Sequence, residues 1–332
     1  MTELPIKNKS FDESGAQYAW DATSLTLAQT CLRKYYYKMI EGWQPRGLSV
    51  HLRFGQHYAT ALEHFYKHRA LGLDKDAALH LVIREALEAT WDYPVCPECQ
   101  GAGEVEEIAC TACDGTGREQ SGIPWTSGHP AKTRENLIRT IIWYIDQFDD
   151  ESIKVLTLAN GLPAVEYSFS LPVDNNIIFS GHIDRLVTYG DDIMVMDQKT
   201  SGSAITPHFF SQFKPNTQMS LYTFAGKMIY NLPVKGVIID GAQIAVGFSA
   251  FGRGFTFRTP SELNEWYDDS LYWVDQARTA TLNRNFPMNP ASCGNYGGCE
   301  FRNVCSKSPE IRGQFLKGDF EQLPTWDPLK AR

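Results

Sequence analysis

Apolar residues recur at spacings of three and four through most of the first 93 residues. Three segments carry this pattern clearly, 24–43, 54–72 and 74–91, and a fourth follows at 131–148. Such spacing places the apolar side chains on one face of a helix. The sequence therefore predicts a helical layer in the first third of the chain.

Beyond residue 161 the apolar period changes toward alternation, which is typical of strands. Segments 162–173, 176–189 and 191–200 predict a β-meander, with a tight turn at YGDD between the last two. Further strands are expected near 234–246 and 252–259. These segments together predict a sheet in the second half of the chain.

Helices are expected at 209–230 and 261–283, with Pro215 at the start of the first or at a kink in it. Helices that pack on a mixed sheet form an α/β or α+β core. We expect four parts, namely an N-terminal helical part of the main domain, an inserted cysteine module, the core of the main domain, and a C-terminal cysteine segment with the tail. Their bounds are 1–93, 94–120, 121–290 and 291–332.

Composition narrows the class of protein. The chain has 332 residues, of which 43% are hydrophobic, and this is sufficient for a large core. No apolar run reaches the roughly 18 residues that span a bilayer, and the N-terminus lacks a basic region followed by an apolar one. We therefore expect a cytoplasmic protein without membrane association. The net charge of -8 supplies no overall attraction to nucleic acid, although a groove can be locally basic.

Four of the eight cysteines form two CxxC pairs, Cys96 with Cys99 and Cys110 with Cys113. In a reducing compartment, clustered cysteines favour a metal site, and this spacing suits one tetrahedral zinc ion. Glycines at 101, 103, 115 and 117 allow the positive-φ backbone that points the thiolates at the metal. Unligated surface thiols are the alternative, but they leave the doubled spacing unexplained. The repeated CxxCxGxG resembles the zinc module of DnaJ-type chaperones, over these residues alone and without an HPD motif.

The segment GHIDRLVTYGDDIMVMDQKTS carries the second candidate site. Asp197 and Lys199 are two apart on a predicted strand and share a face, while Asp184 lies across the turn on the preceding strand. Two carboxylates can hold Mg²⁺ or Mn²⁺, and a lysine beside them can assist deprotonation of water or stabilise a phosphate transition state. Ordinary surface charges on an exposed hairpin are the alternative. The apolar IMVM before Asp197 argues for a buried strand, where unpaired acidic groups are costly.

These segments resemble the PD-(D/E)XK nucleases, and within them the RecB-like branch. GHIDRLV, VMDQKTS and QMSLYTFA are similar to that branch's G-x-I-D strand, D-x-K-T strand and Q-x-x-x-Y helix. FGQHYATALEHF and AVEYSFSL are similar to its histidine helix and its preceding acidic strand. The resemblance implies a restriction-endonuclease-like core whose metal ligands are His57, Asp184, Asp197 and the carbonyl of Gln198. It also implies catalytic or site-facing roles for Lys199, Glu166, Gln218 and Tyr222.

Each role that rests on the resemblance has a structural alternative. His57 can be a structural helix histidine, and Glu166 an exposed strand residue. Gln218 and Tyr222 are four apart, hence on one helical face, and can be ordinary polar and core residues of that helix. The ordered set of motifs favours the site-facing interpretation.

The remaining cysteines are one early and three late: Cys31, Cys293, Cys299 and Cys305. This arrangement resembles the iron-sulfur staple of the AddB-type and CRISPR-associated RecB-like nucleases, which implies a four-iron four-sulfur (4Fe-4S) cluster. The five residues between Cys293 and Cys299 exceed the gap of that pattern, so a zinc ion at the same thiolates is an alternative. A buried Cys31 and a loose C-terminal loop are a further alternative.

The resemblance implies a metal-dependent DNA nuclease, with exonuclease action on DNA ends favoured. The expected setting is DNA repair, recombination, or phage or CRISPR-type DNA processing. Expected partners are DNA ends or single strands and a recombination or repair protein. Two alternatives are a catalytically silent DNA-binding scaffold on the same fold and a chaperone-like zinc module protein. The intact acidic and lysine set argues against the first, and the missing HPD motif against the second.

Overall fold

The fold is described from a computed structural model. It describes residues 10–330 except 48, 107, 149–151, 159–160, 175, 230–232 and 325, and at positions 229 and 296 the backbone alone. Residues 1–9, which the expectation about the N-terminus includes, and the last residue of the helix expected at 209–230 lie outside this range. Within the described residues, no helix has both the length and the apolar character needed to cross a membrane.

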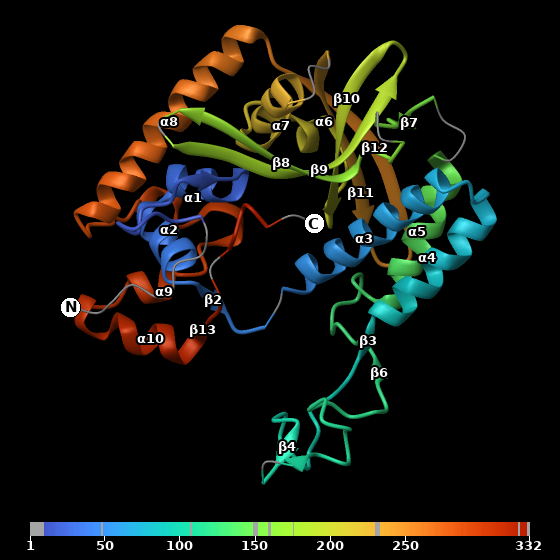
Figure 1. Ribbon diagram of the computed structural model, residues 1–332, viewed down its shortest axis with the longest axis horizontal. Helices are drawn as coiled ribbons and strands as arrows, with labels where there is room; N and C mark the ends of the chain where they lie inside the picture. The colour runs from blue at the N-terminus through green and yellow to red at the C-terminus, as the bar shows by residue number, and fades with distance from the viewer. Residues whose placement is uncertain are drawn as a thin grey trace.

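A seven-stranded mixed sheet forms the centre of the molecule (Figure 1). Antiparallel pairing joins β8, β9 and β10, and β10 runs parallel to β11. A parallel pair needs a crossover connection, which α6 (Pro207–Ser211) and α7 (Thr217–Ile229) supply here. The strands are β1 (Ala19–Trp20), β7 (Lys154–Val155), β8 (Val165–Asp174), β9 (Ile177–Tyr189), β10 (Asp192–Ser201), β11 (Val234–Ile244) and β12 (Ser249–Phe257).

Helices form two apolar cores with the sheet. In the first, α1 (Ala22–Thr30), α7 and α8 (Pro260–Leu282) pack on one another and bury Leu25, Leu221 and Val274 against β9 and β11. The second core joins the far ends of β11 and β12 to three helices, α3 (Val50–Ala70), α4 (Lys75–Ala89) and α5 (Arg134–Phe148). The expected mixed sheet flanked by helices is confirmed.

Two expected helices differ from the structure. The helical segment 24–43 is interrupted at Cys31, whose backbone is extended at φ -168 and ψ 115, and continues as α2 (Leu32–Tyr35) and a π-helical turn (Tyr36–Ile40). The single helix expected at 209–230 is two helices, and Pro215 lies between them after a cis peptide bond. Proline has no backbone N–H for a helix interior, so α7 begins only after it.

The cysteine module projects from the body on a two-stranded stalk between α4 and α5 (Figure 1). The stalk pairs β3 (Trp91–Asp92) with β6 (Ile123–Pro124), and a small hairpin pairs β4 (Glu104–Val105) with β5 (Ile108–Ala109). At the C-terminal end, α9 (Arg302–Cys305) and α10 (Arg312–Asp319) lead to β13 (Phe320–Gln322). β13 pairs with β2 (Trp43–Pro45), so the C-terminal segment lies against the N-terminal helical part.

Candidate active site and metal centres

The central sheet divides at the two candidate aspartates. Pairing of β9 with β10 ends at Arg185 and Met196, whereas β10 stays paired with β11 as far as Ser201. Asp184 and Asp197 are the next residues on the two diverging strands, so both carboxylates lie at the opening. Across it, the backbone N–H of Gln198 donates to Asp184 Oδ2 at 2.8 Å.

A pocket of about 400 Å³ opens at this fork. It is lined by both aspartates and by five other residues of the sequence-derived set, namely Glu166, Gln198, Lys199, Gln218 and Tyr222. These residues come from four separate elements, β8, β9, β10 and α7. The fold thus brings together side chains that are up to 56 positions apart in the chain.

Burial determines the electrostatics of Asp197. Only 1% of this residue is exposed, and burial raises its pKa to about 6. The Lys199 ammonium, 2.5 Å from Asp197 Oδ2, opposes that rise, and Asp184 adds to it. Both aspartates and Glu166 offer carboxylate oxygens to the pocket, which suit hard cations such as Mg²⁺ and Mn²⁺, and the histidines His51 and His182 also line it. The residues present therefore fit a divalent cation at the fork.

Gln218 and Tyr222 lie one turn apart on α7, as their spacing predicts. Gln218 Nε2 donates to Tyr222 Oη at 3.0 Å. Burial raises the pKa of Tyr222, and Asp197 and Asp184 raise it further, so the phenol stays neutral. Glu166 has φ +48, an uncommon value for a residue with a side chain, between the paired positions Val165 and Tyr167.

The structure does not bring His57 into this pocket. Its ring lies 5.9 Å from that of Trp125, and its Nε2 is buried without a hydrogen-bond partner in the described part of the chain. Burial lowers the pKa of His57. The α3 residues that line the pocket are instead His51, Leu52, Gly55, Gln56, Tyr58 and Ala59.

Among the further residues that line the pocket, sequence reasoning missed His51, His182, Asp21 and Trp326. Asp21 caps α1 by accepting from the Ser24 N–H, and its other oxygen accepts from Trp326 Nε1 at 2.7 Å. The N-cap pattern at Asp21 was readable, but its place in the pocket depends on the C-terminal tail. His51 was readable only from the pocket-facing spacing of positions 51, 55 and 59.

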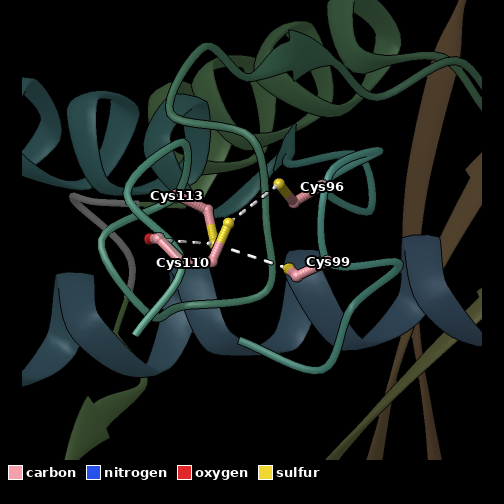
Figure 2. A group of neighbouring side chains, drawn as sticks. All are labelled: Cys96, Cys99, Cys110 and Cys113. Carbon is pink, nitrogen blue, oxygen red and sulfur yellow. Dashed lines mark hydrogen bonds between the residues drawn. The ribbon is translucent and has the colours of Figure 1, made fainter. Parts of the chain in front are cut away.

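The four cysteines of the projecting module point toward one another (Figure 2). Their sulfur atoms all lie within 4.8 Å of one another, with Cys96 and Cys110 at 4.0 Å and Cys99 and Cys113 at 3.7 Å. A tetrahedral zinc with Zn–S bonds of about 2.3 Å separates its sulfurs by roughly 3.8 Å. The set therefore fits a single bound metal ion.

Glycine makes this arrangement of thiols possible. All four module glycines have positive φ, as expected, and a Cβ at Gly103 would lie 2.5 Å from the Gly115 carbonyl oxygen. Burial opposes ionisation of Cys99, but backbone N–H groups of Gly103 and Gly101 lower its pKa to about 7. The backbone therefore both positions and activates a thiolate ligand.

The other four cysteines, which we call the staple, line one cavity of about 310 Å³: Cys31, Cys293, Cys299 and Cys305. The backbone N–H of Asn289 donates to Cys31 Sγ at 3.3 Å, and that of Arg33 donates to the Pro287 carbonyl at 3.2 Å. Among the described residues, only the module cysteines have all their ligand atoms within 4.8 Å of one another. The staple sulfurs thus line one cavity but do not all lie within 4.8 Å of one another.

The family model described as PD-(D/E)XK nuclease superfamily matches residues 19–306. No curated protein matches the chain. Among solved structures, a Eubacterium rectale protein provisionally named an exonuclease aligns at 10% identity and a TM-score of 0.46, over 92% of this chain and 96% of its own. The structure of SSO0001 aligns at 12% identity and a TM-score of 0.24, over 42% and 59%. Because the family model spans most of its length, the chain belongs to the PD-(D/E)XK nuclease superfamily.

Proposed function

We propose that this nuclease is a Mg²⁺- or Mn²⁺-dependent deoxyribonuclease that removes nucleotides from DNA ends. One observation carries the proposal: Asp184, Asp197 and Lys199 meet in a single pocket at the fork of the sheet. A role in DNA repair, recombination or phage-type DNA processing in the cytoplasm is the setting that we propose for it.

The residues divide the work of phosphodiester hydrolysis. Asp184 and Asp197, with the Gln198 carbonyl and Glu166 beside them, would hold the cation, which supplies Lewis-acid stabilisation and a more acidic water when bound. Lys199 reaches the pocket with its side chain 28% exposed, so its charge is available to the phosphate oxygens. Tyr222 accepts from Gln218, which leaves its phenolic hydrogen available to orient a substrate oxygen.

An end-labelled DNA digestion tests this function. Linear duplex and single-stranded DNA, covalently closed circles and RNA would each be incubated with Mn²⁺, Mg²⁺ or a chelator. We expect metal-dependent release of label from linear DNA and intact closed circles, with Asp184→Asn as the inactive control. Cleavage of closed circles would contradict the exonuclease mode, and preference for RNA would contradict the DNA assignment.

Metal binding should depend on pH because of Asp197. Its folded pKa is raised to about 6, and the group ligates a cation only as the carboxylate. Below that pH a proton competes with the metal, so Mn²⁺ affinity should fall about tenfold per pH unit on acidification and level off above it. Calorimetric titration at several pH values measures this. Asp197→Asn should bind Mn²⁺ weakly, and its affinity should change less with pH. If the Mn²⁺ affinity of the wild-type protein does not change with pH, Asp197 is not a ligand of the metal site.

We propose that the four module cysteines hold one structural zinc ion. Cys96→Ser should release about one zinc per chain, measured by elemental analysis, because each thiolate is one of four ligands. Cleavage should persist at least in part, since the module stands apart from the fork on its stalk (Figure 1). Complete loss of cleavage in a folded variant would instead make the module part of the substrate channel.

Charge indicates what the module contacts. Segment 94–120 contains one arginine and six acidic residues: Glu98, Glu104, Glu106, Glu107, Asp114 and Glu119. Such a balance disfavours direct contact with DNA phosphates. We therefore propose a protein, in keeping with the expected recombination or repair partner, as the binding partner of the module.

We propose that the staple holds a 4Fe-4S cluster that joins the two ends of the chain. The support is the single cavity shared by all four cysteines and the spread of their sulfurs, which exceeds that of the zinc-like set in the module. Thiolates hold such clusters through four cysteine ligands.

A further inference from the structure

A group of cations lies beside the active-site pocket, at the first turn of α3. His51, on that turn, lines the pocket, and its ring packs edge-on against that of His129 with centroids 5.0 Å apart. Lys132 follows in the same loop, with Nζ 4.7 Å from the centre of the Phe54 ring. Three basic side chains thus lie close together, and one of them, His51, lines the pocket.

Lys132 has an unusual environment for an ammonium group. The residue is 2% exposed, and no carboxylate among the described residues forms an ion pair with it. Burial lowers the pKa of Lys132 to about 8. Burial also lowers the pKa of His51, and Lys132 and His129 lower it further, with no acidic group opposing them. A buried cation without a counter-ion is costly, so an anion bound beside it would remove that cost.

The N-terminal end of α3 adds positive charge beside these three basic side chains. Its N-cap residue, Ser49, makes no side-chain capping bond, so the N–H groups of the first turn lack that partner. The N-terminal end of a helix also carries partial positive charge. Arg53, one turn further on, is not part of the group because it pairs with Asp92 and packs over Trp125.

We propose that His51, His129, Lys132 and the first turn of α3 bind a phosphate of the nucleic-acid substrate other than the one that is cleaved. The inference rests on the proposed function, because the cation-binding fork and this group share one pocket through His51. A nucleic acid presents phosphates at regular intervals, so a strand whose scissile phosphate is at Asp184 and Asp197 can place a neighbouring phosphate here. Its charge would supply the counter-ion that Lys132 lacks.

Binding of single-stranded DNA tests the site independently of cleavage. All variants would carry Asp197→Asn, and anisotropy of a short fluorescent oligonucleotide would be measured over a range of salt concentrations. Adding Lys132→Met should weaken binding about tenfold and reduce the slope of log affinity against log salt by about 0.7, the contribution of one phosphate contact. Lys317→Met, an exposed lysine on α10, is the matched control and should change neither quantity.

A second measurement covers the case in which Lys132→Met does not fold. Inorganic phosphate added to the otherwise unaltered chain should shift the NMR signals of the His51 and His129 rings, and His51→Ala should lower the salt slope. Unmoved ring signals, or wild-type slopes in both folded variants, would overturn the proposal. The position of the bound phosphate follows from comparing oligonucleotides with and without a terminal phosphate. If Lys132→Met weakens the binding of both equally, the bound phosphate is internal. If it weakens the binding of the phosphorylated oligonucleotide alone, the bound phosphate is terminal. If these binding results are obtained but the chain without Asp197→Asn cuts no DNA, the proposed function is contradicted and the phosphate site is not.

Discussion

Lys199→Ala should lower DNA cleavage by about a thousandfold or more while Mn²⁺ still binds. Charge stabilisation by one positioned group contributes 10²–10³ and proton transfer about 10²–10⁴, and Lys199 is placed for both roles. Its ammonium lies 2.5 Å from Asp197 Oδ2, and the partly exposed side chain faces the pocket. The loss should appear in kcat rather than in substrate affinity, because the lysine acts where negative charge develops in the transition state.

Single-turnover digestion of end-labelled DNA at saturating enzyme measures this loss, with circular dichroism to establish the fold. Lys235→Ala is a suitable control, since it removes a lysine from the adjacent strand β11 that forms an ion pair with Asp192. Cleavage near the wild-type rate in folded Lys199→Ala would exclude the lysine from the chemistry. A loss of DNA affinity that accounts for the whole defect would make it a binding residue instead.

The strands, and the face of the sheet on which their acidic residues lie, could be predicted because both depend on residues that are close together in the sequence. Alternation along 191–200 fixes that Asp197 and Lys199 share a face, and the short turn places Asp184 on the neighbouring strand. The opening between β9 and β10 could not be predicted in this way. It arises because β9 continues with β8 while β10 continues with β11, which is a choice between distant partners.

The histidine shows where sequence reasoning fails on a helix. His51 and His57 both lie on α3, and a period of 3.6 does not say which face meets the sheet when apolar residues surround both. Close packing decides it. A Cβ at Gly55 would lie 3.3 Å from Thr200 Oγ1, so the helix approaches β10 along the face of Gly55. His57 is two positions away and turns toward Trp125.

The break between α1 and α2 at Cys31 could not be predicted from the sequence either, because no glycine or proline marks it. The segment LAQTCLRKYYYK has helical periodicity throughout. The extended backbone at Cys31 is held by partners more than 250 positions away, through the hydrogen bonds of Arg33 to Phe286 and of Asn289 to Thr30. The break turns the Cys31 thiol toward the C-terminal cysteines, so the local irregularity accompanies the staple cavity.

Cys31→Ala should abolish the colour of anaerobically purified protein and lower its thermal stability. The proposed 4Fe-4S cluster on the staple would make the protein brown, and a cluster with one of four thiolates removed is lost or weakened. Such a cluster would also link residue 31 to residue 293, so it would restrict the unfolded chain as a cross-link does over a very long loop, an effect of several kcal/mol. A thiol that only fills space at Cys31 would leave the colour unchanged and cost little stability.

Visible absorption, iron and zinc analysis and thermal unfolding, all under anaerobic conditions, measure these effects. Cys96→Ser is the matched control, since it should lose zinc but keep iron and colour. Colourless wild-type protein with two zinc ions per chain would contradict the cluster and retain the staple as a zinc site, and one zinc without iron would contradict both. We expect iron, because sulfurs that share one zinc ion lie roughly 3.8 Å apart, and the staple sulfurs, unlike those of the module, do not all lie within 4.8 Å of one another.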